Sequence, residues 1–129
     1  MASTQRQTNV EIVQRIYTAF NDGDLDTVVG TLADDVEWTE PAGFFIGGTF
    51  NGPDAVRTEV MEPCAEKFET FTVDPERFLE DGNTVVILGA FHATTPDGEH
   101  IESPFAHVSE VADGEIIRFE NFTDTALWP

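Results

Sequence analysis

The chain has 129 residues, 40% of them hydrophobic, which fits one domain (1–129) with a substantial apolar core. Its formal net charge of −19, from 25 acidic and 6 basic residues, would repel the phosphate backbone of nucleic acids. No apolar run approaches the roughly 18–20 residues that a membrane span needs, and the N-terminus lacks the apolar segment of a secretory signal, so a cytoplasmic protein is expected.

The acidic excess also makes the chain repel itself, which destabilises a folded state at low ionic strength. At about 1 M salt the Debye length falls to roughly 3 Å, and most of that repulsion disappears. The composition is therefore typical of a halophilic protein, with an acidic mesophilic protein as the alternative. Cys64 is the only cysteine, so neither an internal disulfide nor a cysteine-based zinc cluster is possible.

The first half of the chain predicts three helices. Apolar residues recur at helical spacing from Ile12 to Phe20, after a possible cap at Thr8 or Asn9. A shorter helix follows Asp24, which is a candidate cap, and "ADDVEWTEP" (33–41) is typical of a turn leading into a strand. A third helix over roughly 53–68 contains Pro63, which is expected to kink or split it.

The second half predicts four strands, over 71–78, 84–94, 100–111 and 115–123. Each connection contains Asp-Gly, which tolerates the positive φ angles of tight hairpin turns. Helices followed by a meander of strands indicate an α+β domain, with the helices on one face of an antiparallel sheet.

Two-residue loops at Asp97-Gly98 and Asp113-Gly114 would set the register of the last hairpins. His92 would then lie opposite Ser103, and His107 opposite Glu120. Alternation along the strands places a mixed polar and aromatic set on one face, typical of a lined cavity: His92, Ser103, Phe105, His107, Glu120, Phe122 and Asp124. The other face receives an apolar set: Val85, Ile87, Phe91, Ala106, Val108, Ile117 and Phe119. Pro104 implies an edge or a bulge, and a bulge would exchange the faces beyond it.

Three segments carry a resemblance that covers nearly the whole chain in order: "IVQRIYTAFNDGDLDTVVGTLADDVEWTEP" (12–41), "GTFNGPDAV" (48–56) and "HVSEVADGEIIRFENFTDT" (107–125). The chain resembles the SnoaL-like polyketide cyclases, which belong with ketosteroid isomerase in the nuclear-transport-factor-2-like superfamily. The resemblance implies a curved antiparallel sheet wrapped around about three N-terminal helices, forming a cone with an apolar pocket. It also implies a homodimer, because dimers are common among relatives.

The same resemblance implies three catalytic residues. Asp124 in "FTDT" matches the acid/base aspartate of SnoaL-type cyclases, and His107 matches a pocket histidine of those enzymes. Glu40 falls where ketosteroid isomerases place their general base. Those isomerases also use an oxyanion-hole tyrosine on the first helix; Ile16 aligns with it, and Tyr17 is one position away, which turns a helical side chain by about 100°.

Six further residues are candidates for the wall of the pocket: Trp38, Tyr17, Phe20, Phe105, Phe122 and His92. Each has an ordinary structural alternative, which is packing in the core for the aromatic residues. Phe44 and Phe45 lie in a glycine-rich loop and could form a lid, a packing contact or a dimer contact.

The chemistry expected from these residues needs no metal and no cofactor, because the histidines lack chelating spacing and "GFFIGGTFNG" lacks the lysine of a phosphate loop. The leading hypothesis is an acid/base enzyme acting on a small apolar ligand with a carbonyl group, by ring closure or double-bond isomerisation. Asp124 would remove the proton, and His107 would steady the oxyanion. The alternatives are a binding protein with the same pocket, and a dimerising scaffold whose cavity is filled by its own side chains.

Overall fold

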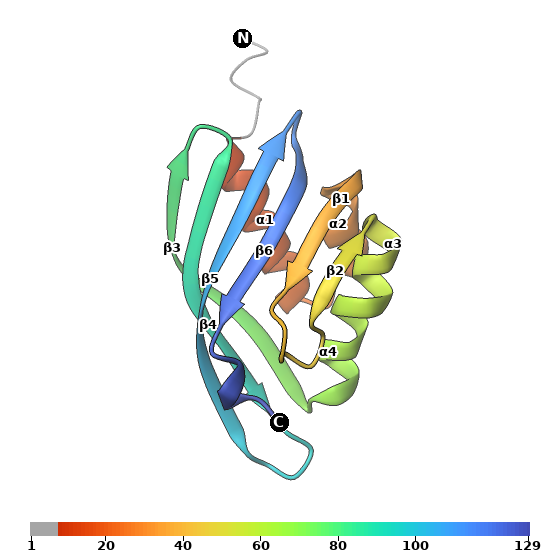
Figure 1. Ribbon diagram of the computed structural model, residues 1–129, viewed down its shortest axis with the longest axis vertical. Helices are drawn as coiled ribbons and strands as arrows, with labels where there is room; N and C mark the ends of the chain where they lie inside the picture. Colours follow the sequence, from red (N-terminus) through yellow and green to blue (C-terminus); the bar gives the residue numbers. More distant parts are fainter. Residues whose placement is uncertain (1–7) are drawn as a thin grey trace.

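The structure, a computed structural model, describes residues 8–129 (Figure 1). Its helices are α1 (Asn9–Asn21), α2 (Leu25–Gly30), α3 (Pro53–Val56) and α4 (Glu62–Lys67), with a π-helical turn at Arg57–Met61 and a 3₁₀ turn at Thr125–Leu127. Its strands are β1 (Leu32–Glu40), β2 (Gly48–Asn51), β3 (Thr70–Asp81), β4 (Thr84–Thr94), β5 (His100–Ala112) and β6 (Glu115–Thr123). The α+β fold with N-terminal helices and a curved sheet is confirmed.

The starts of the first two helices are closed by side chains, as predicted. Thr8 Oγ1 accepts a hydrogen bond from the Glu11 N–H at 3.1 Å, and Glu11 Oε1 accepts one from the Thr8 N–H at 2.9 Å. This reciprocal capping box satisfies two backbone donors that the helix itself leaves free. Asp24 caps α2 by accepting from the Thr27 N–H.

The third predicted helix is interrupted just before Pro63, as predicted. Residues 57–61 form a wide π-helical turn in which the Glu62 N–H donates to the Arg57 carbonyl, five residues back. Because proline has no N–H and its ring clashes with the preceding turn, the widened turn accommodates it without ending the helix. The turn also places Met61 and Cys64 against the sheet side of the helix, where both are buried.

The six strands form one sheet in the order β2-β1-β6-β5-β4-β3 (Figure 1). An antiparallel sheet was expected, and four of the five neighbouring pairs are antiparallel, but β1 and β6 run parallel, so the sheet is mixed. Local turn signals cannot reveal this pair, because its paired residues are more than eighty positions apart in the sequence. The short strand β2, within the glycine-rich stretch, was not predicted either; it pairs with the end of β1.

The register of the β4–β5 hairpin differs from the prediction. Thr94 lies opposite His100, so the loop has five residues, Thr95 to Glu99, instead of two. The Thr95 backbone and hydroxyl close this loop by hydrogen bonds to Glu99 and Gly98. The shift of one residue exchanges the faces of β4, so Phe91 lies inside and His92 is exposed, which is the reverse of the predicted arrangement.

The β5–β6 hairpin begins in the predicted register, with Val111 opposite Ile116, and then shifts by one residue. Ile117 is the extra residue, because the next pair joins Glu110 to Arg118. Beyond this bulge every β6 side chain lies on the face opposite to the predicted one. His107 therefore pairs with Asn121, and the predicted pair with Glu120 is wrong.

The buried side chains of the described residues form one cluster between the helices and the inner face of the sheet. Figure 1 shows α1 crossing behind the sheet, which curves around it. Among residues 8–129, no helix is both long enough and apolar enough to cross a membrane.

Candidate functional site

A cavity of about 50 Å³ lies between the helices and the inner face of the sheet. That volume has room for a few water molecules. Its wall is almost entirely apolar, and only four of the lining residues carry a titratable group, namely Tyr17, Glu40, Cys64 and His107. The other lining residues are Ile16, Phe20, Val28, Trp38, Phe44, Ile46, Val60, Met61, Phe71, Val73, Phe91 and Phe119.

Glu40, the last residue of β1, places a carboxyl group in this apolar wall, and the residue is only 6% exposed. The Trp38 indole N–H donates to Oε2 at 2.8 Å, and the Asn121 side-chain amide donates to Oε1 at 2.9 Å. Among residues 8–129, no cationic side chain forms an ion pair with it. Burial raises the pKa of Glu40 to about 7, although both hydrogen bonds act to lower it.

This pKa has a consequence for stability. A pKa of 4.5 in the unfolded chain and of about 7 in the folded one corresponds to a cost of about 3 kcal/mol for the ionised carboxyl group. Below pH 4.5 the group is protonated in both states and costs nothing. As the pH rises from 4.5 to 7 the folded state loses this free energy, and above pH 7 the full cost remains. A buried carboxylate kept at such a cost is typical of a functional group.

His107, at the middle of β5, is 3% exposed and faces the same cavity. Its Nδ1 lies 2.7 Å from the Tyr17 hydroxyl, and its ring stacks on Phe105 at a centroid distance of 3.8 Å. Burial lowers the pKa of His107 to about 3, so the imidazole is neutral at pH 7. Burial, followed by the nearby Glu40, raises the pKa of Tyr17 well above its ordinary value, and the phenol stays protonated.

Asn121 connects these two halves of the site and was not predicted. It is 2% exposed on the inner face of β6, donates a hydrogen bond to Glu40, and is paired with His107 on the neighbouring strand β5. Its side chain also acts to raise the pKa of His107. The bulge at Ile117 turns Asn121 inward, so only a correct placement of that bulge could have identified it.

The structure brings five of the predicted site residues together around the cavity. Glu40, His107, Trp38, Tyr17 and Phe20 all line it. Although Tyr17 is one position from the aligned oxyanion-hole tyrosine, it and its neighbour Ile16 both face the cavity, because the helix presents this edge to the sheet. Phe105 is buried behind His107 as a stacking partner and does not line the wall.

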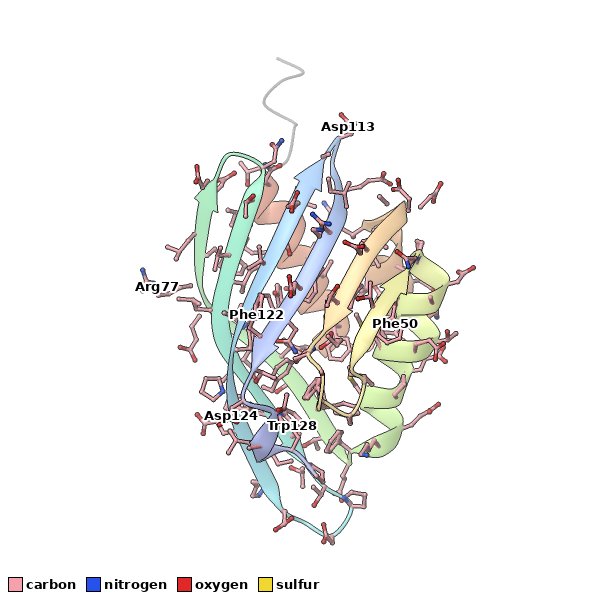
Figure 2. The ribbon with its side chains drawn as sticks, viewed as in Figure 1. Phe50, Arg77, Asp113, Phe122, Asp124 and Trp128 are labelled. Carbon is pink, nitrogen blue, oxygen red and sulfur yellow. The ribbon has the colours of Figure 1, made fainter. Side chains whose placement is uncertain are left out.

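Three other predicted residues lie outside the cavity. Phe122 is 49% exposed on the outer face of β6, and His92 is exposed beside Asp74 at 3.6 Å. Asp124 is exposed and accepts a hydrogen bond from the Ala126 N–H at 3.1 Å, which caps the 3₁₀ turn (Figure 2). The expectation that Asp124 turns inward to the pocket is wrong, because the β6 bulge reverses the faces of the strand beyond it.

Aromatic rings close one side of the cavity. Phe44 lines the wall and contacts Trp128 edge to face at a centroid distance of 5.0 Å. Trp128 follows the 3₁₀ turn at the end of the chain, packs also against Phe68, Phe71 and Phe91, and is 7% exposed (Figure 2). The C-terminal residues therefore cover the Phe44 side of the site.

Residues 8–129 contain no group of three His, Cys, Asp or Glu side chains placed to hold a metal ion. The chemistry that the described site offers is therefore that of one carboxyl group, one phenol, one thiol and one neutral imidazole in an apolar wall. A carboxyl with a pKa near 7 can accept and return a proton at neutral pH.

Comparison with known proteins agrees with this architecture. The profile of the SnoaL-like domain matches residues 13–119. The chain belongs to the SnoaL-like family. An uncharacterised protein of Mycobacterium tuberculosis is 29% identical to this SnoaL-like protein over 114 residues, which cover 88% of this chain and 87% of the other.

Two solved structures extend the comparison. A nuclear-transport-factor-2-like protein of Burkholderia thailandensis is 32% identical, with 95% of each chain covered and a TM-score of 0.89. TerC, which was co-crystallised with polyporic acid, is 28% identical, with 92% of each chain covered and a TM-score of 0.84.

Proposed function

We propose that this SnoaL-like protein is a cofactor-independent acid/base enzyme that removes a proton next to the carbonyl group of a small apolar ligand. The observation that carries the proposal is the carboxyl group of Glu40, buried in an apolar cavity with a pKa of about 7. Glu40 takes the role of general base that the resemblance assigns to Asp124, because Asp124 is exposed and does not line the cavity.

Tyr17 and His107 are suited to stabilise the negative charge that develops on the carbonyl oxygen. The Tyr17 hydroxyl lies at the wall and already contacts the imidazole, which holds it in place. A fixed donor in an apolar site stabilises such an oxyanion more than water does, because the local dielectric is low and little reorganisation is needed. Ring closure by aldol chemistry and double-bond isomerisation both begin with the removal of a proton next to a carbonyl group.

Two features support a small apolar ligand as the substrate. The wall consists mainly of aromatic and aliphatic side chains, and the similar protein TerC was co-crystallised with polyporic acid. The volume of about 50 Å³ is smaller than the roughly 300–1,000 Å³ typical of ligand pockets. Binding therefore requires side chains to move, and Met61, with three rotatable bonds, is the most adaptable of the lining residues.

The exchange of α-protons in 2-tetralone, measured in D₂O by NMR, tests the proposal. We expect the protein to accelerate exchange above the buffer rate, with a rate that rises through a midpoint near pH 7, because Glu40 must be ionised to act as a base. Binding of 2-tetralone without accelerated exchange would favour a binding protein. Neither binding nor exchange, for 2-tetralone and a panel of larger cyclic ketones, would favour a scaffold with a filled cavity.

We also propose that the outer face of the sheet binds a second copy of the chain. Cross-strand neighbours on β3–β6 place apolar side chains in a continuous group there: Leu79, Val86, Leu88, Ala106, Val108 and Phe122. Leu79 and Phe122 are 44% and 49% exposed, and contiguous exposed apolar groups of this kind are typical of protein interfaces. A homodimer would use the same group on both copies.

Replacement of Phe122 by Glu is expected to shift the dimer to monomers, because it places a charge on the most exposed member of the apolar group. Since each chain carries a formal charge of −19, dimerisation should strengthen from 0.1 to 2 M KCl. Sedimentation velocity measures both effects. Ala65→Glu adds the same charge on the exposed side of α4 and should leave the dimer intact. A wild-type protein that is monomeric at every salt concentration would contradict the proposal.

A further inference from the structure

Asn121 lies between the two polar halves of the cavity and contacts groups of different chemistry. Its Nδ2 donates to Glu40 Oε1 at 2.9 Å, and His107 lies opposite it on the neighbouring strand. Asn121 Oδ1 and His107 Nε2 are both buried, and neither has a hydrogen-bond partner in this arrangement. His107 Nδ1 in turn lies 2.7 Å from the Tyr17 hydroxyl. The four side chains therefore lie in one row from Glu40 to Tyr17, and two unpartnered polar atoms, Asn121 Oδ1 and His107 Nε2, are at its centre.

When Glu40 is ionised, it determines which group donates and which accepts in every hydrogen bond of this row. A carboxylate can only accept, so Asn121 must direct its NH₂ group to Glu40 and its carbonyl oxygen to His107. His107 then carries its single proton on Nε2, and Nδ1 accepts from the Tyr17 hydroxyl. In this state the phenol proton is held by the imidazole and is not available to a ligand.

The protonated form of Glu40 allows the opposite direction. Its O–H can donate to Asn121 Oδ1 once the amide has turned over, and the NH₂ group then donates to His107 Nε2. The imidazole carries its proton on Nδ1 and donates to the Tyr17 oxygen, so the phenol proton is free to point into the cavity. The imidazole and the phenol hold one proton each in both states, and the two states differ only by the proton on Glu40.

We propose that Asn121 couples the ionisation of Glu40 to the tautomer of His107, and thereby determines whether the Tyr17 hydroxyl can donate to a ligand. The catalytic meaning of this coupling rests on the proposed function: Tyr17 becomes a donor when Glu40 has taken the substrate proton, which is when the oxyanion needs one. Asn121 is then a positioning residue, since it acts through Glu40 and His107.

Among the titratable groups that line the cavity, Glu40 is the one that gains or loses a proton near neutral pH. The titratable groups that share its cavity are Tyr17 from α1, Cys64 from α4 and His107 from β5. The Cys64 thiol donates to the Val60 carbonyl at 3.2 Å, and burial raises its pKa, so it stays neutral. Charged side chains are absent from the rest of the described lining.

The test follows the ¹⁵N shifts of His107 from pH 5 to 9 in the full chain without any ligand. His92 and His100 are replaced by Gln, because both are exposed and would obscure the signal. We expect the ring to stay neutral while its proton moves from Nε2 at high pH to Nδ1 at low pH. The ratio of the tautomers should change at least tenfold, with the same midpoint as the Glu40 carboxyl.

Three variants separate coupling from a merely structural role. Asn121→Leu should leave Glu40 titrating but fix the tautomer ratio. Glu40→Gln should also fix the ratio, and it tests the coupling even if Asn121→Leu does not fold. Thr123→Val is the matched control, since Thr123 lies two residues along β6 and bonds Ser103 and Pro104 instead, so it should retain the coupling.

A wild-type tautomer ratio that is the same at pH 5 and pH 9 would overturn the inference, as would full coupling in Asn121→Leu. Neither result depends on turnover, because no ligand is present. If the wild-type protein shows no coupling but still exchanges the protons of 2-tetralone, Asn121 is refuted as the link and Glu40 remains the base. Intact coupling without any exchange would refute the proposed function alone.

Discussion

Replacement of Glu40 by Gln is expected to slow the exchange of 2-tetralone α-protons by about 10²–10⁴-fold, which is the usual contribution of a general base. The amide keeps the shape of the side chain and can still accept from the Trp38 indole, but it cannot take a proton at neutral pH. The same variant should gain up to about 3 kcal/mol of unfolding free energy above pH 7, because a buried charge is removed. Increased stability would show that any loss of exchange is not due to unfolding.

Asp124→Asn is the matched control for this experiment. Asp124 is exposed and bonds only the backbone of its own turn, and Asn can make the same hydrogen bond. We therefore expect exchange within about twofold of the wild-type rate, since no group at the cavity changes. Full exchange in Glu40→Gln together with loss in Asp124→Asn would reverse the assignment of the base and contradict the site described above.

Replacement of Trp128 by Ala is expected to lower the free energy of unfolding by about 3–5 kcal/mol, the range for a buried Trp or Phe. The indole is 7% exposed and lies within 6 Å, between ring centroids, of Phe44, Phe45, Phe68, Phe71 and Phe91. Its Nε1 makes no hydrogen bond, so the loss is one of packing alone. Urea unfolding followed by far-UV circular dichroism measures the change.

Leu127→Ala provides the comparison, because Leu127 is the preceding residue and is 46% exposed. Its replacement should cost less than about 1 kcal/mol, since little apolar surface is uncovered. Equal stabilities of Trp128→Ala and the wild-type protein would mean that the C-terminal residues do not cover the cavity in solution. A wider cavity in the Trp128 variant should also admit larger ketones.

The helices and their caps were predictable because their signals are local. Thr8 and Asp24 each cap a helix through contacts three residues away, and Pro63 acts on the turn next to it. The strands of the second half were also recognised from short alternating runs. The fold class followed from the order of these elements and from the resemblance to the SnoaL-like family.

The side chains that each strand turns toward the core were less predictable, because one extra residue exchanges the two faces of a strand. The five-residue loop after β4 turned His92 outward, and the bulge at Ile117 turned Phe122 and Asp124 outward. Neither irregularity has a strong local signal, since Asp-Gly is equally compatible with tight and longer loops. Asn121 was missed for the same reason, as the predicted register placed it on the other face.

The structure places Glu40, Tyr17 and His107 at the cavity, as predicted, although the residue paired with His107 was predicted wrongly. Glu40 ends a strand whose alternation is unbroken from Val36, and Tyr17 lies on the apolar side of α1. The contact of Tyr17 with His107 depends on how α1 packs against the sheet. The hydrogen bond from Asn121 to Glu40 depends on the parallel pairing of β1 with β6, so neither could be predicted from local patterns. That pairing brings Glu40 beside Asn121 and is a property of the whole sheet.

The ionisation of Glu40 is the central claim, and a pH titration of its side-chain carboxyl carbon tests it most directly. The signal in ¹³C-glutamate-labelled protein is assigned by its absence in Glu40→Gln. The account predicts a midpoint near pH 7, with the carboxyl protonated below it, because burial opposes the charged form. A midpoint near 4.5, the ordinary value for glutamate, would mean that the carboxyl is solvated and would contradict its role as a base tuned for neutral pH.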